Sequence, residues 1–192
     1  MTLKFNLKSL EKKTWTSYFQ DGLWDIFFGL MMVSMGVRAI TIWSYIIMIA
    51  AVLVVPLGKT FITIPRMGSV KFSSERRARQ KKVNFVIGIA LLATAAVLAI
   101  TLLGHYLPPK EIRAAVQGVM FILIFFAIAY FMDFNRLYIY GLLFAVGAVL
   151  WELFGIPAGP VAFIVSGSVA LATGLTYLLK FLRKYTNSKE VA

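Results

Sequence analysis

Residues 159–181 read GPVAFIVSGSVALATGLTYLLKF, and the first charged side chain in this stretch is Lys180. A helix needs about 20 predominantly apolar residues to cross the hydrocarbon core of a bilayer, which is about 30 Å thick. Residues 83–106 form a second long stretch of this kind. These two segments are the clearest transmembrane helices in the sequence, and they determine the expected fold class.

The composition of the whole chain agrees with this reading. Hydrophobic residues make up 60% of the 192 residues and charged residues 15%, and the mean hydropathy is +0.81. A soluble domain is normally about 45–50% apolar and about 25% charged, and a chain this short cannot bury so much apolar surface in water. We therefore predict an all-α integral membrane protein, with residues 1–192 forming a single transmembrane domain.

Six stretches are apolar enough to be predicted spans. They are residues 20–37, 39–58, 83–106, 113–132, 136–154 and 159–181. The first two are separated only by Arg38 and its neighbours, and one continuous helix over 23–58 would be about 54 Å long, too long for one crossing. Two helices joined near Arg38 fit better, and a single tilted span followed by an interfacial segment is the alternative.

The basic residues orient these spans. The net charge is +12. With six spans, 17 of the 20 basic residues fall on the side of the N-terminus, and the other three are Arg38, Lys110 and Arg113. Basic residues collect on the cytoplasmic side of a membrane. We therefore expect a multi-pass protein of the cell (inner) membrane with both termini cytoplasmic, including segment 1–19, loop 59–82 and tail 182–192.

Several classes of enzyme are excluded by residue types that the sequence lacks. There is no cysteine and only one histidine, His105, which excludes disulfide frameworks, iron–sulfur clusters, thiolate zinc sites and haem held by two histidines. Neither a G-x-S-x-G motif nor a phosphate-binding G-x-x-x-x-G-K-[ST] loop occurs. We expect no catalytic residues, no metal and no cofactor.

The loop 59–82 is the most distinctive polar stretch, with eight basic residues and one acidic residue. Its first half is rich in β-branched residues around Pro65–Gly68, which predicts a hairpin-like excursion. Its second half is expected to be helical and to run into the third span. Each basic residue near an anionic surface contributes about 1 kcal/mol, so we expect anionic lipid headgroups as ligands and no nucleic acid. The candidate binding residues are Arg66, Lys71, Arg76, Arg77, Arg79, Lys81 and Lys82.

Asp25 lies about one turn inside the first predicted span, and Asp21 precedes it by four residues. Their spacing of four places them on one helix face. Ionisable groups at membrane depth are costly and often functional, which makes the pair a candidate ion or polar site. Acidic residues are also favoured at a helix N-terminus, with basic residues nearby, and this structural interpretation is the stronger one. Near the other surface, Arg38 is expected to pair with Glu152.

Small residues at helical spacing predict faces where helices pack closely. The fourth span contains the bulky run 120–126 and is expected to face lipid or a second protomer. The stretch 85–95 faintly resembles 163–174, which suggests a weak three-plus-three repeat. The predicted packing residues are Gly29, Gly36, Gly141, Ala145, Ser166, Ala170 and Gly174.

Two strings in the sequence resemble a known group of proteins. Residues 21–30 read DGLWDIFFGL, and residues 65–77 read PRMGSVKFSSERR. Both are similar to segments of small, uncharacterised prokaryotic multi-pass membrane proteins, and this resemblance implies a membrane location without an activity.

The predicted function is therefore that of a non-catalytic scaffold or accessory subunit, whose basic loop contacts anionic lipid or a partner. The partner would be a membrane or cytoplasmic protein, or a second copy of the chain. The alternative is a small transporter or channel for an ion or small solute.

Overall fold

The structure is a computed structural model that describes residues 21–38, 41–67, 78–79, 81–86, 88–89, 92 and 109–185. Its elements are α2 (Leu23–Val37), α3 (Ser44–Gly58), the π-helix η1 (Lys59–Thr63), α4 (Ile64–Met67), α6 (Lys110–Met132), α7 (Arg136–Phe154) and α8 (Ala158–Lys184). The described part of the chain is helical and contains no strand. The predicted all-α class is confirmed.

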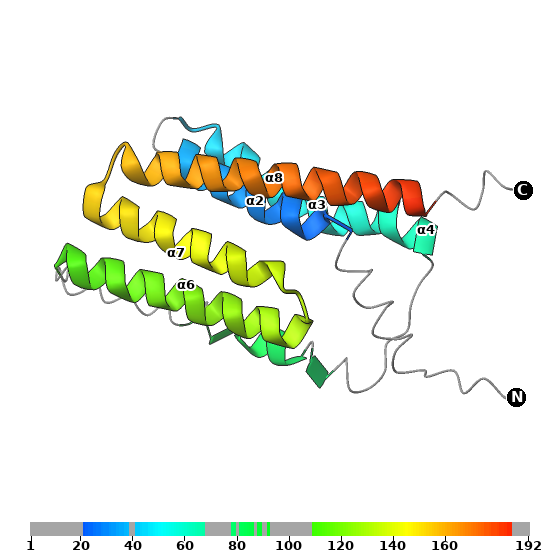
Figure 1. The fold of residues 1–192 in the computed structure, drawn as a ribbon, viewed down its shortest axis with the longest axis horizontal. Helices are drawn as coiled ribbons and strands as arrows, with labels where there is room; N and C mark the ends of the chain where they lie inside the picture. The colour runs from blue at the N-terminus through cyan, green and yellow to red at the C-terminus, as the bar shows by residue number, and fades with distance from the viewer. Residues whose placement is uncertain are drawn as a thin grey trace, which may run out of the picture.

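The helices form a bundle in which α2 and α8 run antiparallel, as do α6 and α7, and α7 and α8 (Figure 1). Helix α8 packs most extensively against α2, and α7 lies between α8 and α6. One end of the bundle contains the start of α2 and the last residues of α4, α6 and α8. We call it the Asp25 end. Helices α3, α6 and α8 begin at the opposite end, which we call the Glu152 end.

In the part of the chain that the structure describes, four helical segments are long and apolar enough to cross a membrane. They are Ser44–Met67, Lys110–Met132, Arg136–Phe154 and Ala158–Lys184. Helix α2 is a shorter apolar helix of 15 residues, about 22 Å long. The predicted span 136–154 has the same bounds as α7. Most of the predicted span 83–106, and with it one half of the predicted repeat, lies outside the described residues.

The predicted hairpin-like excursion at the start of loop 59–82 is wrong. Helix α3 continues through η1 into α4, so that the backbone is helical from Ser44 to Met67. Pro56 lies inside α3, where it cannot donate the usual backbone hydrogen bond. The following turn widens into the π-helix, a common adjustment inside α-helices. The β-branched pattern was misleading because the chain remains in an apolar helical span.

Helices α2 and α8 approach each other so closely that glycine is required at their contact. A side-chain carbon on Gly29 would lie 2.9 Å from the backbone oxygen of Gly167, and one on Gly167 would lie 2.7 Å from the oxygen of Gly29. Gly36 faces Pro160 in the same way, and Gly22 faces Gly174. The contact therefore repeats every seven residues along two antiparallel helices. Removing the side chain lets the backbones approach, as in other close helix pairs.

The other predicted packing residues lie on several faces. Ala170 is buried and Ser166 is half-buried on α8. On α7, Ala145 is buried, and a side-chain carbon on Gly141 would lie 2.6 Å from Cβ of Phe125 on α6. The packing face predicted on α8 assumed small residues every four positions, and it therefore missed Gly167. The contact with α2 instead repeats every seven residues along α8.

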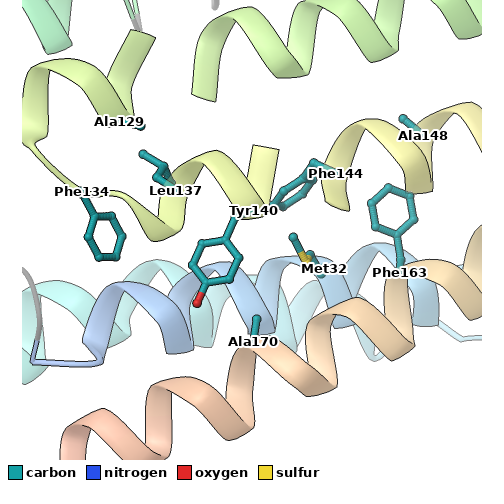
Figure 2. Close-up of a cluster of buried hydrophobic side chains, with 9 residues drawn as sticks. All are labelled: Met32, Ala129, Phe134, Leu137, Tyr140, Phe144, Ala148, Phe163 and Ala170. Atoms are coloured by element: carbon teal, nitrogen blue, oxygen red, sulfur yellow. The ribbon is translucent and has the colours of Figure 1, made fainter. Parts of the chain in front are cut away.

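Aromatic rings from four helices fill the centre of the bundle. The buried residues include Met32 of α2, Phe144 of α7 and Phe163 of α8 (Figure 2). Phe121 and Phe125 of α6 lie 5.6 and 5.0 Å from Phe144, measured between ring centroids. The expectation that the whole run 120–126 faces outward is therefore wrong for one side of α6, because residues four apart share a helix face.

Substitution of Gly167 tests the contact between α2 and α8. We expect Gly167→Leu to lower the free energy of unfolding by about 1–3 kcal/mol or more, because overpacking displaces neighbouring groups and here the nearest atoms belong to the backbone of α2. Val165→Leu is the matched control, since Val165 lies on the same helix and is 58% exposed. Thermal unfolding in detergent, followed by size-exclusion chromatography, measures both. Equal stability of the two variants would contradict the close packing.

Candidate functional site

The carboxylate of Asp21 is completely buried at the start of α2 and is bound by groups from η1. Its Oδ2 atom accepts hydrogen bonds from Lys59 Nζ at 2.5 Å and from Thr63 Oγ1 at 2.7 Å. Its Oδ1 atom accepts a hydrogen bond from the backbone N–H of Leu23 at 3.2 Å. Lys59 is itself only 7% exposed. The pair is therefore a buried salt bridge that connects α2 to the continuation of α3.

The carboxylate of Asp25 is also completely buried and interacts with α7. Tyr140 donates a hydrogen bond to its Oδ1 atom, and Figure 2 shows the Tyr140 side chain directed from α7 toward α2 and α8. The Oδ2 atom lies 3.2 Å from Nη2 of Arg136, without hydrogen-bond geometry. Arg136 thus neutralises Asp25 mainly by proximity of charge.

The guanidinium of Arg136 is enclosed by aromatic rings. Its Cζ atom lies 3.9 Å from the ring centroid of Tyr177 on α8 and 5.0 Å from that of Phe134. A cation is attracted to the face of an aromatic ring, and the attraction is stronger when water is excluded. Arg136 therefore joins α7 to α8 as well as to α2.

The two acidic residues do not form one site facing a common ligand. Asp21 precedes the first helical residue of α2, and its side-chain partners are on η1, whereas those of Asp25 are on α7. Each carboxylate already has a cation beside it. Chemically, the arrangement can hold three helices together by charge at the Asp25 end, and among the described residues no group of three acidic or histidine side chains could hold a metal ion.

The structure describes four of the predicted basic residues, and three of these contact neighbouring groups. Arg66 lies in α4 and donates to the carbonyl of Ile62 at 3.3 Å, so it is not held in a turn. Arg79 bonds to Asp133 at the end of α6 at 3.1 Å, and Lys82 lies 5.8 Å from the ring centroid of Phe131. Lys81 is exposed. The candidates Lys71, Arg76 and Arg77 lie outside the described residues.

A cavity of about 460 Å³ lies at the Glu152 end, between α2, α6, α7 and α8. Here the expected pair of Arg38 and Glu152 is wrong, because Glu152 is bound by Arg113 of α6, with N–O distances of 2.9 and 3.0 Å. The residues that line the cavity are Met35, Arg38, Gln117, Phe121, Ala148, Trp151, Glu152 and Phe163.

Sequence reasoning missed the partners of both buried carboxylates. Lys59 and Arg136 were assigned to cytoplasmic loops by their charge, and Thr63 and Tyr140 were not considered. One signal was present: Lys59 is the only charged residue between Arg38 and Arg66, and Thr63 follows it by four residues, which places the two on one face of a helix. The choice of Asp21 as their partner is a long-range contact that no local pattern indicates.

Removal of Arg136 tests the charge balance around Asp25. We expect Arg136→Leu to destabilise the protein by about 3–5 kcal/mol, because it leaves a buried carboxylate without its cation. The matched control is Arg183→Leu, at an exposed position on α8, for which we expect a change within about 0.5 kcal/mol. Unfolding in mixed micelles measures both. A loss for Arg136→Leu no larger than the control would show that the ion pair contributes little.

Comparison with known proteins does not assign this chain to a family. No family model matches the sequence. No curated protein and no solved structure is similar to it at a significant level. The interpretation of the buried ion pairs, the basic residues and the cavity therefore depends on their own geometry and chemistry.

Proposed function

We propose that this protein is a non-catalytic membrane scaffold or accessory subunit that presents a basic surface to anionic lipid headgroups at the Asp25 end. The observation that carries this proposal is the placement of exposed cations. The exposed basic residues described at that end are Lys180, Arg183 and Lys184 near the end of α8, and Arg79, Lys81 and Lys82 near the end of α6, where Arg79 pairs with Asp133 and Lys82 lies beside Phe131.

The interior of the bundle supports a structural role more than a polar pathway. The buried carboxylates at the Asp25 end are each next to a cation, the buried Lys59 beside Asp21 and the half-buried Arg136 beside Asp25. Between them and the cavity at the Glu152 end lie the packed rings of Phe28, Phe125 and Phe144. A rigid, closely packed bundle is well suited to hold a charged surface at a fixed depth in the membrane.

The proposal includes the orientation and the six spans. Basic residues favour the cytoplasmic side, so the Asp25 end and the C-terminal end of α8 would face the cytoplasm of a cell with both termini inside. Met67 lies at the Asp25 end and Lys110 at the Glu152 end. A span over 83–106 would connect these two positions, and α2 would supply the remaining crossing.

A small transporter or channel is the second candidate function. It is favoured by Asp25, a completely buried carboxylate inside an apolar helix, because ionisable groups at membrane depth often belong to ion pathways. The two functions differ in one measurable property. Reconstituted vesicles containing a scaffold would show the same ion and solute permeability as empty vesicles, whereas a transporter would accelerate flux.

Lipid selectivity tests the basic surface. In nanodiscs containing both phosphatidylglycerol and phosphatidylcholine, we expect the full chain to be enriched in phosphatidylglycerol, as measured by native mass spectrometry of the lipids that remain bound. Lys81→Ser should lower the preference by about fivefold, because each basic residue contributes about 1 kcal/mol at an anionic surface. Added salt should lower the preference further.

Lys110→Ser is the matched control for this experiment. Lys110 is an exposed lysine at the Glu152 end, and Glu111 beside it offsets its charge. We expect this substitution to leave the lipid preference almost unchanged. The proposal would be contradicted by an equal affinity for both lipids, or by equal effects of the two substitutions.

A further inference from the structure

The cavity at the Glu152 end has the chemical character of a ligand site. Its volume of about 460 Å³ lies within the range of about 300–1,000 Å³ that is typical of small-molecule pockets. Its walls include three aromatic rings, those of Phe121, Trp151 and Phe163. Such sites are mostly apolar and contain a few polar groups that orient the ligand, and here these groups come from α2, α6 and α7.

The charges around this cavity leave one cation available. Glu152 is neutralised by Arg113, whose Nη2 atom lies 2.9 Å from its carboxylate. Among the described residues, Arg38 forms no ion pair with a carboxylate. Gln117 contributes an amide, which can donate as well as accept hydrogen bonds. The wall of the cavity therefore carries a net positive charge at Arg38.

The backbone of Arg38 is held at the C-terminal end of α2. Its backbone N–H donates to the carbonyl of Ser34 at 3.0 Å. The buried hydroxyl of Ser34 in turn donates to the carbonyl of Ser44 at 2.8 Å. This bond fixes the end of α2 against the start of α3, so the backbone that carries Arg38 is well positioned beside the cavity.

We propose that this cavity binds a small organic monoanion, with an apolar body and one anionic group. The guanidinium of Arg38 would bind the anionic group, because charge-assisted hydrogen bonds to carboxylates and phosphates are the strong ones. The rings of Phe121, Trp151 and Phe163 would pack against the apolar body. Two sources supply this chemistry: a water-soluble molecule, and an anionic lipid of the surrounding leaflet.

The site is separate from the basic surface in the proposed function. Arg38 and Met35 lie near the C-terminal end of α2, whereas Asp21 and Asp25 lie at its start. At 1.5 Å per residue, the distance from Asp25 to Arg38 along the helix is about 20 Å. Loss of lipid binding at the Asp25 end would therefore not affect this cavity, and the two proposals can fail independently.

The test compares 2-naphthoate with its neutral analogue 2-naphthamide, using the full chain in phosphatidylcholine nanodiscs. Isothermal titration, corrected with empty nanodiscs, measures saturable binding. We expect one naphthoate per chain and an affinity about tenfold or more above that of the amide, which reflects the contribution of a charged hydrogen bond. Arg38→Gln should reduce the affinity for naphthoate to that of the amide. Arg38 is exposed, so this variant is expected to fold.

Two further variants locate the binding. Ala148→Phe adds a ring to a residue that lines the cavity, and it should abolish binding of both compounds. Lys110→Gln removes a cation at the same end that does not line the cavity, and it should leave binding unchanged. The proposal is overturned if naphthoate shows no saturable binding, if Arg38→Gln binds it as tightly as the original chain, or if Lys110→Gln weakens binding as much as Arg38→Gln.

Phosphatidylglycerol distinguishes the two sources of the ligand. If an anionic lipid occupies the cavity, phosphatidylglycerol in the nanodiscs should compete with naphthoate and weaken its binding to the original chain. The residual binding of naphthoate to Arg38→Gln should not change. Unchanged naphthoate affinity would identify a water-soluble monoanion as the ligand class. Both results support the anion site, and they differ only in the origin of its occupant.

Discussion

Asp21 and Asp25 must be neutralised before the start of α2 can be buried, and the positions of α3 and α7 follow from this requirement. An isolated carboxylate in an apolar environment is very costly, and buried charges in proteins are therefore paired and hydrogen-bonded. Both carboxylates are completely buried, and each obtains its cation from a different helix. The pairing with Lys59 requires the α3 segment to remain helical past the point where its charge suggests a loop. The pairing with Arg136 fixes the beginning of α7.

The close contact between α2 and α8 involves the same helix that carries the buried carboxylates. Helix α2 crosses α8 with Gly22, Gly29 and Gly36 facing Gly174, Gly167 and Pro160. This approach brings the start of α2 within reach of Tyr140 and Arg136, while Tyr177 of α8 covers the guanidinium. Close packing and charge pairing thus support each other. Within the described residues, the ion pairs of Asp21 and Asp25 lie at one end of the bundle, and the cavity with the Arg113–Glu152 ion pair lies at the other.

The parts of this fold that depend on local pattern could be predicted from the sequence. The apolar stretch 136–154 has the bounds of α7, because a charged residue and a glycine mark its ends. The partners of the buried carboxylates could not be predicted in this way. Lys59 and Asp21 are 38 residues apart, and a lysine after an apolar stretch is normally a sign that the span has ended.

The partner of Glu152 and the lining of the cavity could not be predicted from the sequence either. Glu152 was expected to pair with Arg38 because both lie near one surface, but Arg113 is the partner. Depth in the membrane can be estimated from position in the sequence, whereas the neighbour around the helix axis depends on how each helix is rotated. The cavity lining combines residues of four helices for the same reason, and no single stretch of sequence indicates it.

If buried charge pairing fixes α2 against its neighbours, Asp21 and Lys59 must be strongly coupled in stability, and a double-mutant cycle between them measures this coupling. The free energy of unfolding would be measured in mixed micelles for Asp21→Asn, Lys59→Met and the double variant. We predict that Lys59→Met alone costs about 3–5 kcal/mol, since it leaves a buried charge unpaired, and that the double variant is much more stable than the sum of the single losses implies. Additive losses, within about 0.5 kcal/mol, would contradict the claim.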